Sequence, residues 1–181
     1  MARKPNISVI GSYTATESEF RLSRELGNAL SNYNVNVICG GQKGVMEGVC
    51  RGAQEHPKDH KLCTVIAIMP SDQLDEGNPF LDVVIPMGSK GLQNIVIPLS
   101  GDVVIAIGGA AGTLTELGFA WQYKKPIALL GETGWSKTLA NQKLDDRRTD
   151  KMVHFSDVPS VISWLIELLS LDEVSMNSSS P

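Results

Sequence analysis

The residues of this chain best suited to chemistry lie in two glycine-rich turns, each placed where an apolar run ends and a helical pattern begins. The first turn, residues 40–46, reads Gly-Gly-Gln-Lys-Gly-Val-Met, and the second, residues 108–116, reads Gly-Gly-Ala-Ala-Gly-Thr-Leu-Thr-Glu. Glycine lets the backbone approach a ligand closely, and a helix N-terminus offers unpaired N–H groups and the positive end of a dipole. Each turn therefore predicts a site for phosphate or another anion. Two such turns in one small chain favour a nucleotide-like ligand lying between them.

Short apolar strands alternate with amphipathic helices along the sequence, and this order predicts how the turns are positioned. Strands are expected at residues 7–10, 35–39, 64–69, 83–86, 103–107 and 126–130, and helices at 17–30, 45–54, 91–100, 113–123 and 158–169. The pattern predicts a single three-layer, Rossmann-like α/β domain with a parallel sheet over residues 1–170. The polar stretch 131–151 is expected to be a connection, and residues 171–181 a frayed tail. Both turns follow strands, so we expect them to face one crevice at the carboxyl edge of the sheet.

Composition narrows the class of protein. The chain has 181 residues, of which 42% are hydrophobic and 20% charged, as is typical of one soluble globular domain. The net charge of −4 argues against broad nucleic-acid binding but leaves room for a small anionic ligand in a local site. No apolar run approaches the roughly 18 residues of a membrane span, and the run at residues 7–10 is too short for a signal peptide. We therefore expect a cytoplasmic protein that binds neither nucleic acid nor membrane.

The cysteines Cys39, Cys50 and Cys63 are odd in number, and their spacing fits no zinc pattern. We expect them to be buried free thiols in a reducing compartment, and we expect no metal site. The alternative for Cys39, which abuts the first glycine turn, is a role with a soft metal.

The two turns, taken in order, resemble those of the Lonely Guy-like superfamily, long described as possible lysine decarboxylases. Members of that superfamily carry Gly-Gly-x-x-Gly-x-Met after the second strand and Pro-Gly-Gly-x-Gly-Thr-x-x-Glu after a later one. The first turn of this chain matches in full. The second keeps Gly109, Gly112, Thr113 and Glu116, with Gly108 at the proline position and Ala110 at the second glycine. The likeness runs from residue 7 to about residue 169 and includes Trp121-Gln122 and Lys125-Pro126.

One activity implied by the resemblance is hydrolysis of nucleoside 5′-monophosphates, AMP or cytokinin nucleotides, at the N-glycosidic bond. In that hypothesis Gly112 and Thr113 hold the phosphate, and Glu116 is the catalytic carboxylate facing the ribose, where positive charge develops. Taken alone, Glu116 could instead be a first-turn acid that complements the helix dipole. The enzymes also carry an arginine–lysine pair whose arginine is catalytic. Here that pair falls on Gln93-Asn94, with Lys90 expected one helical turn earlier. Since glutamine carries no fixed charge, the change argues against hydrolysis.

The other branch of the superfamily that the chain resembles is the molybdenum cofactor carrier proteins. The resemblance lies in length and in the opening Val9-Ile10-Gly11-Ser12. These proteins bind an anionic, phosphate-bearing pterin with a dithiolene-held metal, and they need no catalytic arginine. The resemblance therefore favours a carrier of the molybdenum cofactor, assembled as a homodimer or homotetramer, with the hydrolase as the alternative. The residues expected to bind the ligand are Gly11, Ser12, Gly40, Gly41, Lys43, Gly44, Lys90, Gln93, Gly108, Gly109, Ala110, Ala111, Gly112, Thr113 and Glu116.

Overall fold

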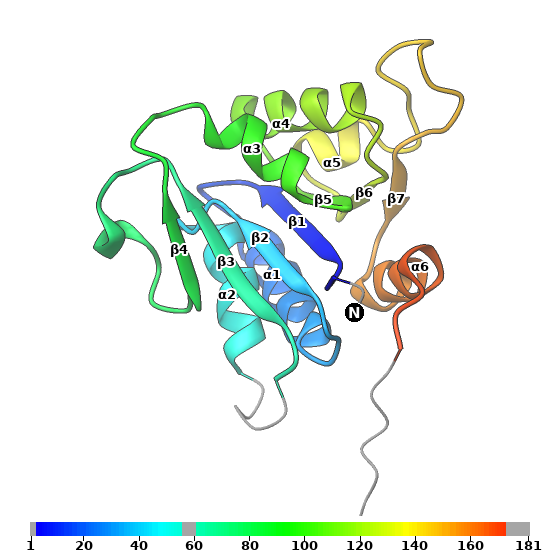
Figure 1. The fold of residues 1–181 in the computed structure, drawn as a ribbon. Coiled ribbons are helices and arrows are strands. Elements are labelled where there is room, and N and C mark those ends of the chain that lie inside the picture. Colours follow the sequence, from blue (N-terminus) through cyan, green and yellow to red (C-terminus); the bar gives the residue numbers. More distant parts are fainter. Residues whose placement is uncertain (1–2, 56–60, 173–181) are drawn as a thin grey trace, which may run out of the picture.

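A parallel β-sheet forms the centre of the molecule. The computed structural model describes residues 3–55 and 61–172. Within them the sheet has seven strands in the order β4-β3-β2-β1-β5-β6-β7, and every neighbouring pair is parallel (Figure 1). The strands are β1 (Asn6–Gly11), β2 (Asn36–Cys39), β3 (Thr64–Met69), β4 (Val83–Pro86), β5 (Val103–Ile107), β6 (Ile127–Leu130) and β7 (Val153–Phe155). The predicted parallel α/β fold is confirmed.

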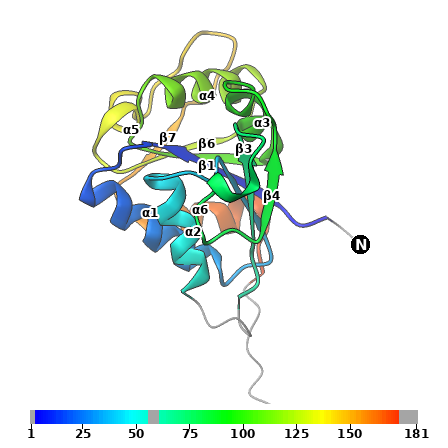
Figure 2. The same ribbon diagram turned by 90° about the vertical axis from the view of Figure 1, so that its left-hand side faces the viewer.

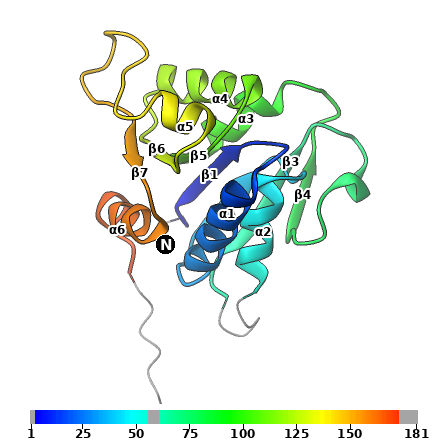
Figure 3. The same cartoon turned by 180° about the vertical axis from the view of Figure 1, so that it is seen from behind.

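Helices cover both faces of this sheet and complete three layers. Figures 2 and 3 show α1 (Glu17–Leu30), α2 (Val45–Gln54) and α6 (Val158–Leu169) on one face. On the other face lie α3 (Gln93–Ser100), α4 (Ala111–Gln122) and α5 (Gly134–Thr138). A single 3₁₀ turn, η1 (Leu74–Glu76), lies between β3 and β4. In the described part of the chain, no helix is long and apolar enough to cross a membrane.

Two hydrophobic cores hold the layers together, one on each face of the sheet. The first joins α1, α2 and α6 to the sheet, and the second joins α3, α4 and α5 to it. All five residues of β5 are buried, because helices cover both faces of this central strand. Trp121 of α4 is 2% exposed and belongs to the second core. Its indole N–H donates to Asp145, and the Arg148 guanidinium lies 4.4 Å from its ring centre, so the charged cluster at 145–148 packs onto this side chain.

The direction of the connections reverses at β1 and β5. From β1 the chain proceeds through β2 to β3 and β4 at one end of the sheet, and from β5 it proceeds to β6 and β7 at the other. Ligands of open α/β sheets bind outside the carboxyl ends of the strands at such a reversal. The second glycine turn follows β5, at the reversal itself, and the first follows β2, the strand next to β1.

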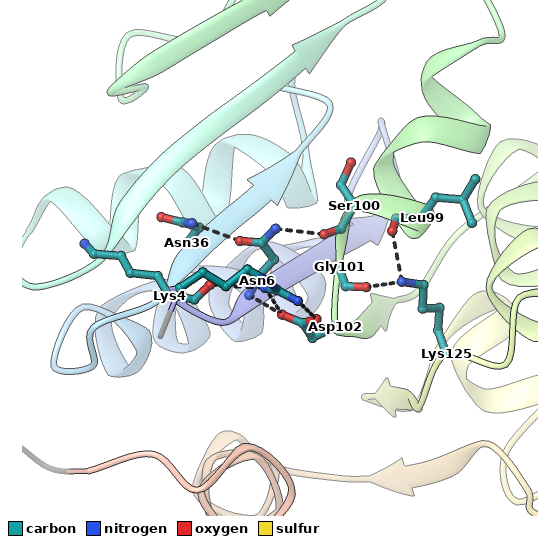
Figure 4. A network of polar contacts seen from close by, with 9 residues as sticks. Lys4, Asn6, Asn36, Leu99, Ser100, Gly101, Asp102 and Lys125 are labelled. Carbon is teal, nitrogen blue, oxygen red and sulfur yellow. Dashed lines mark hydrogen bonds and ion pairs between the residues drawn. The ribbon is translucent and has the colours of Figure 1, made fainter. Parts of the chain in front are cut away.

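Polar side chains close the opposite, amino edge of the sheet (Figure 4). Asn6 at the start of β1 donates to the Ser100 carbonyl and accepts from Asn36, while Asp102 accepts from the Asn6 backbone N–H. Lys125 donates to the Leu99 and Gly101 carbonyls at the end of α3. A cation at a helix C-terminus is favourable, so Lys125 fixes the end of the helix that borders the site.

The element boundaries differ from the sequence prediction mainly in the polar stretch 131–151. That stretch contains helix α5, and strand β7 follows it as the edge of the sheet; neither was predicted. Helix α3 begins at Gln93 rather than at residue 91, and it continues through the buried Pro98 to Ser100. His56 and His60 lie outside the described residues. So do residues 173–181, which are most of the tail expected to be frayed.

Candidate functional site

A pocket at the carboxyl ends of β1, β2 and β5 brings parts of both glycine turns together. The first turn contributes Gly40 and Gln42, and the second contributes Ala110, Gly112, Thr113 and Glu116. Gly11 at the end of β1 lies between them, and α3 adds Gln93 and Asn94 on the far wall. The expectation that the two turns face one crevice is therefore confirmed.

The second turn needs its first two glycines for reasons of backbone geometry. Gly108 has φ +62° and Gly109 has φ +104°, a region that other residues rarely adopt. A side chain at Gly108 would collide with the Glu19 carboxylate, and one at Gly109 with Thr113. This conformation turns the chain from β5 directly into α4, whose N-terminus then borders the pocket.

Ser12 links the two turns. Its hydroxyl oxygen accepts a hydrogen bond from the Gly109 N–H at 2.8 Å, and its carbonyl accepts the Val45 N–H at 3.0 Å. One residue thus holds the second turn and also satisfies the first N–H of α2. Ser12 is not among the described residues that line the pocket, so its contact with a ligand remains a prediction.

Two further buried polar side chains, Glu19 and Ser136, support the second turn, and neither was predicted from the sequence. Glu19 accepts the Thr133 hydroxyl at 2.6 Å and the Thr16 N–H at 2.8 Å. Ser136 of α5 donates its hydroxyl to the Ala106 carbonyl at 2.8 Å and its N–H to the Gly108 carbonyl at 3.2 Å. The Thr-x-x-Glu capping box at residues 16–19 was the visible signal for Glu19. Nothing local in the sequence indicates that its carboxylate lies under a turn ninety residues away.

Two polar side chains on α4 are buried without partners. Thr113 is 3% exposed and Glu116 8% exposed, and neither side chain makes a hydrogen bond or ion pair to the residues that the structure describes. The N-cap of α4, Ala110, also gives no side-chain hydrogen bond to the first turn of the helix. An unsatisfied buried polar group costs roughly 1–3 kcal/mol, so such groups are rare and call for an explanation. Both side chains line the pocket, where a ligand can supply the missing partners.

Burial changes the protonation of Glu116. Its removal from water raises the pKa of this carboxyl to about 8, and the neighbouring Cys39 sulfur adds a smaller contribution to the rise. Glu116 is therefore mainly neutral at pH 7 in the ligand-free protein. A neutral carboxyl can donate a hydrogen bond, which an ionised one cannot.

Basic side chains are absent from the described lining of the pocket. Lys43 is exposed and borders a neighbouring groove beside Arg21 and Tyr13. Lys90 is exposed and precedes α3, so the expectation that it lies one helical turn before Gln93 is wrong: the helix begins only at Gln93. Gln93 borders the pocket, but its side-chain oxygen accepts the Gly91 N–H at 2.7 Å. The position to which the resemblance assigns the arginine of the hydrolases thus carries no charge here.

The first turn forms one wall of the pocket and is held by hydrogen bonds. Gly41 and Gly44 have φ +67° and +69°. The Gly41 carbonyl accepts two hydrogen bonds from Asn78, at 2.8 and 3.0 Å. Because the Val45 N–H is already bonded to Ser12, the N-terminus of α2 is less open to an anion than that of α4. The second turn is therefore the stronger candidate for the anion.

The three cysteines are buried free thiols, as predicted. The Cys39 and Cys50 sulfurs lie 3.5 Å apart, and the Gly41 N–H points to the Cys39 sulfur at 3.3 Å. Across residues 3–55 and 61–172, no three His, Cys, Asp or Glu side chains are grouped so that they could hold a metal ion.

Comparison with known proteins agrees with this architecture. An uncharacterized protein of Archaeoglobus fulgidus is 32% identical over 124 residues, 68% of this chain and 78% of that protein. The molybdenum cofactor binding protein of the phototrophic bacterium Rippkaea orientalis superposes with a TM-score of 0.81 at 27% identity, covering 93% of this chain and 99% of that one. The molybdenum cofactor carrier protein of Chlamydomonas reinhardtii gives a TM-score of 0.74 at 26% identity, with the same coverage.

The family assignment covers most of the sequence. Residues 4–162 match the SLOG cluster4 family, a span that contains both glycine turns and every strand of the sheet. The resemblance to the Lonely Guy-like superfamily, inferred from the two turns, and that to its cofactor carriers, inferred from chain length and the opening at residues 9–12, are confirmed. The chain belongs to the SLOG cluster4 family.

Proposed function

We propose that this protein binds and carries a small anionic, phosphate-bearing ligand, and that this ligand is the molybdenum cofactor. The observation that carries the proposal is the pair of buried, unpartnered side chains, Thr113 and Glu116, at the open N-terminus of α4. The folded protein bears the cost of leaving them unpaired, and a bound ligand removes it. The structural likeness to two proteins described as molybdenum cofactor binding or carrier proteins supports the choice of ligand.

The phosphate end of such a ligand fits the second turn. In our proposal the free N–H groups at the start of α4 and the Thr113 hydroxyl hold the phosphate oxygens. Gly112 lines this part of the pocket, and a Cβ there would meet no atom within 4 Å. A glycine that the fold does not need, placed at a helix N-terminus, fits close approach of a ligand to the backbone.

The lining of the pocket also suits a polar ring. Gln42 from the first turn and Gln93 and Asn94 from α3 contribute neutral amides to it. Amides both donate and accept hydrogen bonds, as the edge of a pterin requires. The cofactor, when bound, supplies its metal on its own dithiolene sulfurs, so this chain needs no metal ligands. The protein's task is then to bind, orient and shield the ligand.

The hydrolase alternative draws support from one observation, the position of Glu116 beside the predicted phosphate site. Two features argue against it. Gln93 cannot provide the charge of the catalytic arginine, and the loss of one preorganised charge typically costs on the order of 100- to 1000-fold in rate. The raised pKa of Glu116 also leaves little carboxylate at pH 7 to stabilise positive charge on a sugar.

The phosphate contact is tested with Thr113→Val, which removes the hydroxyl and keeps the shape. Loss of a hydrogen bond to a charged group costs roughly 1.5–3 kcal/mol, so the affinity for AMP or inorganic phosphate should fall about 10- to 150-fold. The matched control is Thr115→Val on the same helix, because the Thr115 side chain is exposed and bonds only to the Ala111 carbonyl. Equal affinities of the Thr113 variant and the wild type in calorimetric titrations would remove the basis of the assignment.

The choice between carrier and hydrolase is tested by incubating the protein with AMP and with a cytokinin monophosphate and analysing for free base by chromatography. We expect little or no release. Release at the rate of an ordinary enzyme, abolished in Glu116→Gln, would replace the carrier with the hydrolase. If no free base is released, activity gained in Gln93→Arg would show that the missing charge is the cause.

A further inference from the structure

The pocket poses an electrostatic problem for an anionic ligand. Its described lining contains no lysine, arginine or histidine, so an anion is held only by neutral dipoles: helix N–H groups, hydroxyls and amides. The lining does contain one acid, Glu116, buried one helical turn beyond Thr113. An ionised Glu116 would place two negative charges close together in a site of low dielectric constant, where repulsion is strong.

The groups around Glu116 give its charge no compensation. The other titratable side chain of the described pocket lining is Tyr13, from the β1–α1 connection, and Cys39 at the end of β2 is the titratable group that acts on Glu116. Helix α2 contributes Met46, and α3 contributes the uncharged Gln93 and Asn94. Helix α4 has no charged side chain besides Glu116 itself. Its carboxyl group has no hydrogen-bond donor to stabilise the ionised form in the described residues.

We infer that Glu116 binds the ligand as a neutral acid that donates its proton in a hydrogen bond to the ligand, so that the anion and one proton are held together. This inference rests on the proposed anion site and explains which anions that site selects. The pocket selects an anion that presents a hydrogen-bond acceptor toward Glu116, and it releases that anion when Glu116 ionises.

The expected pH dependence follows from linkage. Burial raises the pKa of Glu116 to about 8, so below this pH the side chain is neutral with or without the anion, and affinity is flat. Above it the ligand-free protein loses the proton while the complex retains it, so affinity falls by up to tenfold per pH unit. Anion binding near pH 8.5–9 should therefore take up close to one proton.

The test uses sulfate as the probe, because its charge is constant between pH 6 and 9, whereas phosphate titrates in this range. Calorimetric titrations are run at each pH in two buffers that differ in ionisation enthalpy, which gives the proton uptake directly. The wild type should bind about tenfold more weakly at pH 9 than at pH 7. Glu116→Gln, a neutral isostere, should bind equally at both pH values, whereas Tyr13→Phe should keep the tenfold ratio between pH 7 and pH 9.

A second measurement does not depend on affinity. The infrared band of the protonated Glu116 carboxyl is identified by its absence in Glu116→Gln. In the wild type this band should persist to about pH 8 without sulfate and to higher pH with sulfate. Sulfate binding with a flat pH profile and no proton uptake would overturn the inference while leaving the anion site intact. Failure of both wild type and Glu116→Gln to bind sulfate or AMP at any pH would overturn the proposed function together with it.

Discussion

Replacing Gly112 with alanine separates the demands of the ligand from those of the fold. A Cβ at Gly112 would meet no atom within 4 Å, and the residue lies in the first turn of α4 with an ordinary helical backbone. Alanine is favoured over glycine by about 0.5–1 kcal/mol inside a helix, and by less near its end. We therefore expect the ligand-free Gly112→Ala protein to be as stable as the wild type or slightly more stable, by roughly 0.5 kcal/mol.

The matched control is Gly118→Ala in the same helix. A Cβ at Gly118 would likewise meet no atom within 4 Å, but Gly118 does not line the pocket. Being in the middle of α4, it should give the larger gain, about 1 kcal/mol, or 2–4 °C in Tm for a chain of this size. Both variants thus report helix propensity, and only one changes the pocket.

Anion binding distinguishes the two variants. The methyl group of Gly112→Ala occupies the space that the bound phosphate needs, so affinity for AMP or phosphate should fall about tenfold or more, equivalent to about 1.4 kcal/mol. Gly118→Ala should bind as the wild type does. Thermal unfolding and calorimetric titration of the three proteins provide the data. A Gly112→Ala variant that gains stability and keeps full affinity would refute the placement of the phosphate at the start of α4.

Three further predictions concern the residues around the pocket. Ser12→Ala removes the hydroxyl that accepts the Gly109 N–H, so unfolding by urea should show a loss of roughly 1 kcal/mol and phosphate affinity should fall; unchanged values for both would mean that Ser12 does not position the second turn. Because burial raises the pKa of Glu116 to about 8, the folded protein binds the carboxyl proton of Glu116 more tightly than the unfolded chain does. The free energy of unfolding should therefore fall by up to roughly 1.4 kcal/mol per pH unit as the pH rises from about 4.5 to 8. Glu116→Gln should therefore be more stable than the wild type at pH 8–9 but not at pH 4, and identical pH profiles of urea unfolding would contradict the neutral, buried Glu116. Thr133→Val removes the hydroxyl that donates to the Glu19 carboxylate and should lower the stability of the protein by roughly 1.5–3 kcal/mol. Thr138→Val, whose exposed hydroxyl bonds within α5, should change the urea midpoint little.

Much of the fold was accessible from local patterns. The helices at 17–30 and 45–54 and the strands at 64–69, 83–86 and 103–107 have the predicted bounds, because apolar periodicity and glycine or proline breaks are strong there. The parallel sheet followed from the all-apolar strands. Helix α5 and strand β7 were missed because one is five residues long and the other three, too short for a periodic signal.

The pocket was predicted less completely than the fold. Motif order placed Gly112, Thr113 and Glu116 together, and the structure brings them into one pocket with Gly40 and Gln93. The contacts that support the second turn could not be predicted from local patterns. Ser12 and Glu19 bond to residues more than ninety positions away, and Ser136 bonds from α5 to β5. Lys90 was misplaced because the helix start depends on the turn at residues 91–92, which the apolar pattern does not show.

The measurement closest to the central claim is the identity of what the protein holds when it is purified under native, anaerobic conditions and examined by mass spectrometry. The proposal predicts a phosphate-bearing pterin that copurifies with the wild type and with Thr115→Val, and that is lost or much reduced with Thr113→Val. A nucleoside monophosphate in the wild type, together with release of free base on incubation with AMP, would contradict the carrier and establish the hydrolase in its place.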